Sequence, residues 1–313
     1  MSLAFVFPGQ GSQAPGMGRD LADAFPIARE TFQEVDDALG QKLSRLMFDG
    51  PGEDLTLTAN AQPALMAVSV ALCRVLGKEG GFDLSRRVSL VAGHSLGEYS
   101  ALTAAGTFDL PTAARLLRQR GDAMQAAVPP GEGAMAALLG ADAAQAEAIC
   151  AEVGHGDVLE VANDNGGGQV VISGGAAAVA RAVEAAKVAG IKRAMILPVS
   201  APFHCAMMEP AARVMQAALE RAAMAHPAVP VVANVTAAPV SDPDVIRGLL
   251  VRQVTGTVRW RECVAAMVAA GCTRFVEVGA GKVLTGLMKR NAPEASAQAI
   301  NNPADVEAFL KSL

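Results

Sequence analysis

The stretch Val88–Gly106, VSLVAGHSLGEYSALTAAG, carries the most informative pattern in the sequence. Apolar and small residues lead into the motif GHSLG at 93–97, and a helical pattern follows at once. We therefore expect the strand Ser89–Ala92 to turn sharply into a helix at Ser95. Such a turn lifts a serine hydroxyl out of the sheet and aims the helix N-terminus at developing negative charge, as in the G-x-S-x-G nucleophile elbow. The alternative is a serine that only caps a helix.

Strand-like and helix-like segments alternate in the rest of the chain outside its middle third. The expected elements are strand Leu3–Phe7, helices near Asp20–Leu39 and Pro63–Leu76, strand Pro230–Val235, helices Asp244–Val254 and Arg261–Ala270, strand Arg274–Val278 and helix Lys282–Arg290. This alternation predicts an α/β fold with a parallel sheet and crossover helices.

The middle of the chain follows a different order. Between 128 and 197 the patterns read β-α-β-β-α-β, the split unit of a ferredoxin-like module. The segment begins at VPPGEG and ends before Pro198. We expect a large domain made of residues 1–127 and 198–313, an inserted small domain of residues 128–197, and a cleft between them.

Composition excludes several classes of function. The formal charge is −5 and no block of Lys and Arg occurs, which argues against a nucleic-acid or anionic-membrane partner. The chain shows no basic leader and no apolar stretch of spanning length free of charge, Gly or Pro, so we expect a cytoplasmic protein with no membrane segment. The 5 cysteines lack paired spacing, which suggests neither a disulfide framework nor a metal site.

A nucleophilic serine needs a base, and the sequence offers four histidines. His94 adjoins Ser95, and neighbours on a sharp turn usually point apart. His155 and His226 lie in segments typical of surface loops. His204 lies in VSAPFHCAMM, where the chain returns from the small domain to the large one, so it can reach over the cleft. We expect His204 to be the base.

Elbow hydrolases place an acid between the serine and the histidine in chain order. The acids considered in this interval, Asp109, Asp122, Asp142, Asp157 and Asp164, are in positions typical of helix caps or turns. No acid is clearly placed for a triad. We therefore expect a Ser-His dyad whose histidine is oriented by a neutral oxygen.

Two glycine-rich segments raise the question of ligand binding by main-chain groups. FPGQGSQAPGMG at 7–18 follows the first strand, and such a loop can bring N–H groups close to a ligand, although glycine loops also simply turn corners. VGAGKVLTG departs from the phosphate-loop motif, because Val276 replaces its first glycine and Val283 its Ser or Thr. We expect no nucleotide cofactor.

Six motifs together identify a resemblance. FPGQGSQ, GHSLGE, RQRGDAMQ, VSAPFHCAMM, LVRQVTGTVRW and EVGAGKVLTGL occur in order from Phe5 to about Arg290. In these motifs the chain resembles the malonyl-CoA:acyl-carrier-protein transacylases, the standalone acyltransferases of dissociated fatty-acid synthesis. The resemblance implies an α/β-hydrolase-like large domain with a ferredoxin-like insert. It also implies malonyl-CoA and the phosphopantetheine thiol of an acyl carrier protein as substrates, with no metal and no bound cofactor.

The resemblance also implies catalytic roles. Ser95 would be the nucleophile and His204 the base. The main-chain N–H groups of Gln10 and Leu96 would form the oxyanion hole. Gln253 would present an oxygen to the His204 ring in place of a triad acid.

The substrate-binding expectations rest partly on the same resemblance. Arg120 would bind the free carboxylate of malonate, since a guanidinium holds a carboxylate with two charge-assisted bonds, and Met124 one turn later would line the same pocket. Phe203 departs from the Ser that standalone members often carry and resembles malonyl-selective polyketide acyltransferase domains, so we expect malonyl to be preferred over methylmalonyl. Asn165 is expected to face the cleft and could bind the pantetheine arm, but an Asn in a Gly-rich hairpin is more often a turn residue.

The resulting hypothesis is ping-pong malonyl transfer by a monomer, in fatty-acid or polyketide synthesis. One alternative is a serine hydrolase or thioesterase that passes the acyl group to water. The other is a catalytically silent protein that docks the carrier. Arg120, together with the lack of a triad acid, argues against the hydrolase, and the combination of Ser95, His204 and Arg120 argues against the silent protein.

Overall fold

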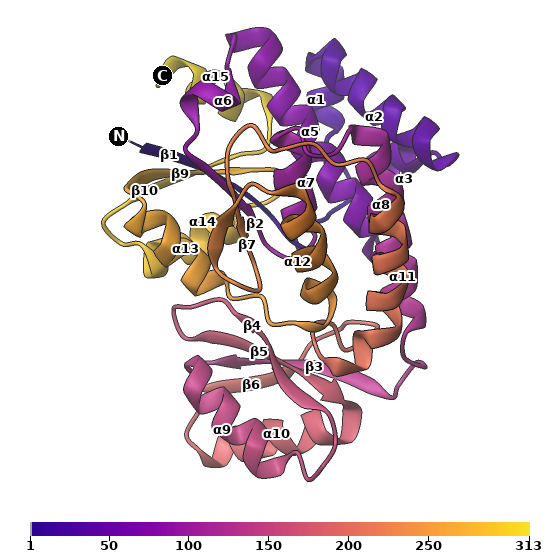
Figure 1. The fold of residues 1–313 in the computed structure, drawn as a ribbon, viewed down its shortest axis with the longest axis vertical. Coiled ribbons are helices and arrows are strands. Elements are labelled where there is room, and N and C mark those ends of the chain that lie inside the picture. The colour runs from indigo at the N-terminus through magenta and orange to yellow at the C-terminus, as the bar shows by residue number, and fades with distance from the viewer. Residues whose placement is uncertain (1) are drawn as a thin grey trace.

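The computed structural model describes residues 2–313 and contains two β-sheets (Figure 1). The larger sheet has the strand order β10-β9-β1-β2-β7-β8. Adjacent strands within this sheet pair in parallel, except β7 and β8, which pair antiparallel. The strands are β1 (Ser2–Phe7), β2 (Leu90–Gly93), β7 (Val231–Ala233), β8 (Ala238–Val240), β9 (Cys272–Val278) and β10 (Ser296–Ile300).

Helices cover both faces of the larger sheet. They are α1 (Arg19–Ala24), α2 (Pro26–Leu39), α3 (Leu43–Asp49), α4 (Gly52–Thr56), α5 (Thr58–Gly80), α6 (Leu84–Arg87), α7 (Gly97–Ala104), α8 (Leu110–Ala126), α11 (Glu209–Arg221), α12 (Pro243–Thr255), α13 (Trp260–Ala269), α14 (Val283–Asn291) and α15 (Pro303–Lys311), with a 3-10 turn at Ala206–Met208. The first strand, β1, and the last helix, α15, lie in the part of the molecule away from the second sheet (Figure 1).

The alternation of side chains along β1 explains the two layers of helices. Leu3, Phe5 and Phe7 pack into the core formed with α2, α5, α7 and α8. Ala4 and Val6 point to the other face, into a core shared with α13 and α14. Because successive residues of a strand face opposite ways, an apolar run such as LAFVF is suited to a strand buried on both sides.

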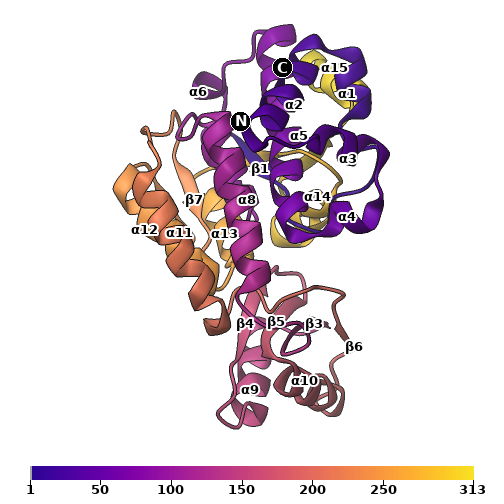
Figure 2. The same cartoon turned by 90° about the vertical axis from the view of Figure 1, so that its right-hand side faces the viewer.

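The second sheet is antiparallel and has the order β4-β5-β3-β6. Its strands are β3 (Gly133–Leu139), β4 (Leu159–Asp164), β5 (Gln169–Gly175) and β6 (Arg193–Ile196), and the helices α9 (Ala143–Val153) and α10 (Ala176–Val188) lie together on one face of it (Figure 2). The predicted β-α-β-β-α-β order is present. The α/β class with a parallel sheet is confirmed, and the domain boundaries at 128 and 197 remain predictions.

Several elements differ from the sequence-based expectation. The helix expected near Asp20–Leu39 is two helices, since Phe25 is extended and Pro26 starts α2. The strands β8 and β10 and the helix α15 were not predicted. β10 is an edge strand with the weakly strand-like sequence SAQAI, and it is specified by pairing with β9.

One helix of the described residues, α5, is long and apolar enough to span a membrane, with a mean hydropathy of 1.3. The same window is 78% buried inside the protein. In this structure α5 is a central core helix, packed against α2, α7 and α8.

Candidate active site

The segment between β2 and α7 forms a strained turn with Ser95 at its apex. Ser95 has φ of 53°, a left-handed conformation that is uncommon outside glycine. A Cβ on Gly93 would lie 1.8 Å from the Gly97 carbonyl oxygen, and one on Gly97 would lie 2.3 Å from the Phe7 carbonyl oxygen. Glycine is therefore required at both positions for the close approach of the strand and the helix. The predicted elbow geometry is present.

Asn234, the residue after β7, hydrogen-bonds to the main chain of the turn that carries Ser95. Its Oδ1 accepts a hydrogen bond from the Ser95 main-chain N–H at 2.8 Å, and its Nδ2 donates to the Gly93 carbonyl at 2.7 Å. Sequence reasoning missed this residue. The available signal was a polar residue at the carboxyl end of a strand in the same parallel sheet as β2.

The serine hydroxyl contacts the expected histidine. Ser95 Oγ lies 2.8 Å from His204 Nε2, and His204 Nδ1 lies 2.9 Å from the main-chain carbonyl oxygen of Gln253. The carbonyl accepts from Nδ1–H, which leaves Nε2 free to accept the serine proton. The oxygen that orients the ring is thus neutral, as predicted, and belongs to the main chain of Gln253.

The environment of His204 keeps its imidazole neutral. The side chain is only 4% exposed. Burial, followed by the positive charge of Arg120, lowers the pKa of His204 to about 3. A neutral imidazole at physiological pH can accept a proton from the serine, as a general base must.

None of the acids considered in the interval is hydrogen-bonded to His204 in residues 2–313. Asp109 and Asp142 cap α8 and α9, as expected, and Asp157 and Asp164 pair with arginines. Asp122 is exposed.

Arg120 from α8 lies beside Ser95 and is almost completely buried, with 1% exposure. Its Nη2 donates to Ser95 Oγ at 3.2 Å and to Gln253 Oε1 at 2.9 Å, and its Nη1 donates to Gln62 Oε1 at 2.8 Å. No carboxylate oxygen lies within 4.0 Å of its nitrogens in residues 2–313. A buried guanidinium with only neutral partners is well suited to bind an acidic ligand. Gln62 was another residue that sequence reasoning missed.

Parallel pairing brings the N-terminal glycine loop to the elbow. Phe7 pairs with Gly93, so the loop after β1 and the turn after β2 leave the same edge of the sheet. The main-chain N–H groups of Gln10 and Leu96 donate no hydrogen bond within residues 2–313. Both residues line the pocket that contains the serine. The two N–H groups are therefore available to a ligand, as an oxyanion hole requires.

The pocket around Ser95 and His204 has a volume of about 340 Å³. Met124 and Phe203 line it, as expected, and so does Asn163. The full lining set is Gln10, Gly11, Gln13, Thr56, Gln62, His94, Ser95, Leu96, Arg120, Met124, Met135, Asn163, Leu197, Pro198, Val199, Phe203 and His204. Met135 and Asn163 lie in strands β3 and β4 of the second sheet, and the other lining residues come from loops and helices. The pocket therefore lies between the second sheet and the loops and helices beside the larger one.

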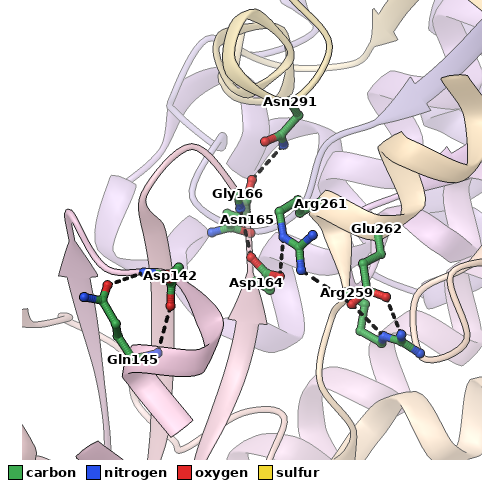
Figure 3. Close-up of polar contacts among 9 residues, drawn as sticks. All are labelled: Asp142, Gln145, Asp164, Asn165, Gly166, Arg259, Arg261, Glu262 and Asn291. Atoms are coloured by element: carbon green, nitrogen blue, oxygen red, sulfur yellow. Dashed lines mark hydrogen bonds and ion pairs between the residues drawn. The ribbon is translucent and has the colours of Figure 1, made fainter. Parts of the chain in front are cut away.

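Asn165 is not among the pocket-lining residues, which corrects the expectation that it faces the cleft. Its Oδ1 lies 2.8 Å from His94 Nε2, and its carbonyl oxygen accepts from Asn291 Nδ2 at 2.8 Å. Beside it, the Arg261 guanidinium pairs with Asp164 at 2.8 Å (Figure 3). These bonds attach the turn after β4 to α13 and α14 of the larger sheet. Asn165 therefore joins the two parts of the molecule, and its side chain is engaged by His94.

The glycine-rich segment before α14 has a structural explanation. The buried Glu277 carboxylate accepts from the main-chain N–H groups of Leu284 and Thr285 at 3.1 and 2.7 Å. A carboxylate already occupies this helix N-terminus, where a phosphate loop would leave it open. Residues 2–313 contain no group of three or more His, Cys, Asp or Glu side chains arranged to hold a metal.

Comparison with known proteins identifies the family. The family model described as "Acyl transferase domain" matches residues 4–305. The chain belongs to this acyl transferase family. The match covers both sheets and all of the residues assembled around Ser95.

Individual acyl transferases are similar over their full length. The malonyl CoA-acyl carrier protein transacylase of Escherichia coli K12 is 48% identical, with 99% of each chain covered. The crystal structure of the acyl-carrier-protein-S-malonyltransferase from Bartonella henselae is 55% identical with a TM-score of 0.98, covering 100% of this chain and 99% of that one. A malonyl-transacylase solved in complex with its type II PKS acyl-carrier protein is 46% identical with a TM-score of 0.96, and 100% of each chain is covered.

Proposed function

We propose that this acyl transferase moves a malonyl group from malonyl-CoA to the phosphopantetheine thiol of an acyl carrier protein, in fatty-acid or polyketide synthesis. The observation that carries the proposal is the buried Arg120 guanidinium, which lies 3.2 Å from the Ser95 hydroxyl and has no carboxylate partner. It can bind the carboxylate that distinguishes malonyl from acetyl groups. The relatives named malonyl transacylases support the same substrate.

The first half-reaction forms the acyl-enzyme. His204 Nε2 accepts the Ser95 proton while Oγ attacks the thioester carbonyl carbon, and the N–H groups of Gln10 and Leu96 donate to the resulting oxyanion. The carbon–sulfur bond then breaks. The CoA thiolate takes the proton back from His204 and leaves as the thiol, and malonyl-Ser95 remains.

The second half-reaction reverses these steps with a different thiol. The carrier's phosphopantetheine thiol gives its proton to His204 and attacks the malonyl ester carbon. Collapse of the oxyanion breaks the bond to Ser95 Oγ, which recovers the proton. The residues of the chain perform both halves without a cofactor, because the acyl group is carried by the serine oxygen itself.

Pocket residues support the substrate preference. Met124 and Phe203 are both buried and line the pocket with Arg120. The Phe203 ring reduces the space available to an α-methyl branch, which favours malonyl over methylmalonyl. Asn163, which lines the pocket from β4, replaces Asn165 as the proposed contact for the pantetheine arm.

The test is intact mass after incubation with malonyl-CoA alone. The wild type should gain one malonyl group and the Ser95→Ala variant none. Ser200→Ala, an exposed serine beyond the pocket-lining Val199, is the matched control and should label normally. Labelling of Ser95→Ala would exclude Ser95 as the nucleophile. Addition of holo carrier protein should then yield malonyl-carrier, whereas free malonate as the main product would indicate a hydrolase.

We also propose that the enzyme acts as a soluble cytoplasmic monomer. The acidic balance, with a formal charge of −5, gives no surface for anionic lipid, and the apolar helix α5 is a core helix. Light scattering of the purified chain should give a mass near 32.0 kDa, and a value of twice that mass would contradict the monomer.

A further inference from the structure

Glu98, in the first turn of α7, is a buried carboxylate that the proposed mechanism does not use. It is 2% exposed. Its Oε2 accepts hydrogen bonds from the Asn234 main-chain N–H at 3.0 Å and from Gln253 Nε2 at 2.9 Å. Burial of an ionisable carboxyl group is unfavourable unless a charge elsewhere compensates. The position of Glu98 therefore calls for a charged partner.

Arg120 is that partner, and it acts through one side chain. The amide of Gln253 donates through Nε2 to Glu98 and accepts through Oε1 from Arg120 at 2.9 Å. The amide dipole is thus aligned between an anion and a cation, with its N–H end at the carboxylate and its oxygen at the guanidinium. Arg120 contacts no carboxylate directly. Its positive charge is therefore balanced by the Glu98 carboxylate, which lies on the other side of the Gln253 amide.

The arrival of substrate changes this balance. Malonyl-Ser95 brings a second carboxylate to Arg120, so that two anions would share one buried cation. Excess negative charge in a low-dielectric site favours protonation of one of the two carboxylates. The malonyl carboxylate makes direct bonds to the guanidinium, whereas Glu98 acts only through Gln253, so Glu98 is the group that protonates.

We propose that Glu98 is the counter-ion of Arg120 in the free enzyme, and that it takes up a proton from solvent when a malonyl carboxylate pairs with Arg120. This proposal rests on the malonyl-transfer function proposed above. It makes Glu98 a positioning residue that acts on the substrate through Gln253 and Arg120. Substrate recognition and the protonation state of the site are then linked.

Glu98, and not one of the groups that face it, is expected to change its protonation state. Burial raises the pKa of Glu98 to about 7, against the lowering effect of its hydrogen bonds and of Arg120. Tyr99 on α7 and Cys263 on α13 also lie near it, and burial raises the pKa of both, so they stay neutral. The segment after β7 and helix α12 contribute only the amides of Asn234 and Gln253.

The experiment measures proton uptake during stoichiometric malonylation by malonyl-CoA at about pH 7.5, with a pH indicator in weak buffer. A carboxyl group with a pKa of about 7 is roughly three quarters ionised at this pH. Wild type should therefore take up as much as about three quarters of a proton per malonyl group. Glu98→Gln keeps the shape but cannot titrate, and should take up none. Both proteins release the same CoA thiol, so its ionisation cancels in the comparison.

Each outcome is decisive when intact mass is recorded on the same samples. A malonylated wild type that takes up no proton overturns the Glu98 proposal but leaves malonyl transfer intact. Proton uptake that persists in Glu98→Gln also overturns it. Absence of the malonyl mass in the wild type refutes malonyl transfer, and the Glu98 proposal with it.

A second measurement covers the case in which Glu98→Gln does not fold. In wild-type protein labelled with carbon-13 at the glutamate carboxyl carbons, one resonance should move toward its protonated position on malonylation. Sulfonylation of Ser95 with a sulfonyl fluoride, which brings no carboxylate, should leave that resonance in place. A spectrum unchanged by malonylation would overturn the proposal.

Discussion

Replacing Arg120 by alanine should reverse the preference of the enzyme for malonyl over acetyl thioesters. The side chain is 1% exposed, and its guanidinium can offer a malonyl carboxylate two parallel charge-assisted hydrogen bonds. Hydrogen bonds to charged groups contribute about 1.5–3 kcal/mol each, so loss of both corresponds to about 10²–10⁴-fold in kcat/KM. Malonyl transfer should fall by this factor.

Acetyl transfer should hold or rise in the same variant. In the wild type an acetyl group would leave the guanidinium without its carboxylate, so the desolvation cost of Arg120 opposes acetyl binding. Alanine removes that penalty. Arg120→Lys should be intermediate, because an ammonium group keeps the charge and lacks the fork.

The assay is kcat/KM for malonyl-CoA and acetyl-CoA in the wild type and both variants. Arg115→Ala, an exposed arginine on the same helix, is the control and should match the wild type. Loss of Arg120 also leaves the oxygens of Gln62 and Gln253 without their donor, so thermal unfolding must be recorded in parallel. An equal loss on both substrates would show that Arg120 supports the fold and does not recognise the carboxylate.

Four further outcomes test the site and the fold around it. His204→Ala should slow acyl transfer by about 10²–10⁴-fold, the usual contribution of a general base. Asp157→Asn should leave the rate nearly unchanged, because that acid pairs with an arginine at the surface. An indispensable Asp157 would indicate a triad. Because the pKa of His204 is lowered to about 3, Ser95 acylation by acetyl-CoA should keep its rate as the pH falls from 7 to 5, and a loss near pH 6.5 would contradict the neutral buried imidazole. The same shift requires folding stability to decrease as pH falls from 6.5 toward 3, where the unfolded chain binds the proton and the folded one does not, and urea titrations should show a smaller decrease in His204→Gln. Gly97→Ala should destabilise the fold by about 1–3 kcal/mol or more in urea titration, because its Cβ would lie 2.3 Å from the Phe7 carbonyl, and wild-type stability would refute the close-packing argument.

The turn that exposes Ser95, the placement of His204 against it and the fold class could be predicted from the sequence because their signals are local. The GHSLG motif at 93–97 combines a strand pattern, two glycines and a helical pattern within a few residues, and only a sharp turn satisfies all of them. The order of strands and helices likewise follows from periodicity along the chain. Recognition of the family, confirmed by the comparisons, depended on six such local motifs in order. The carboxylate-binding role of Arg120 came from its motif and is still to be tested.

The tertiary structure alone decided which groups surround the dyad. Asn234, Gln62 and Glu98 contact partners between 58 and 155 residues away in sequence, and no local pattern shows which partner each one finds. Asn165 directly follows β4, and its side chain hydrogen-bonds to His94, 71 residues earlier. Hydrogen-bond partners of buried polar groups depend on how separate strands and helices pack, because each group must find an acceptor or donor wherever the fold provides one. For that reason the sequence determined the turn that exposes Ser95, and packing determined the main-chain oxygen of Gln253 that orients His204 and the carboxylate that balances Arg120.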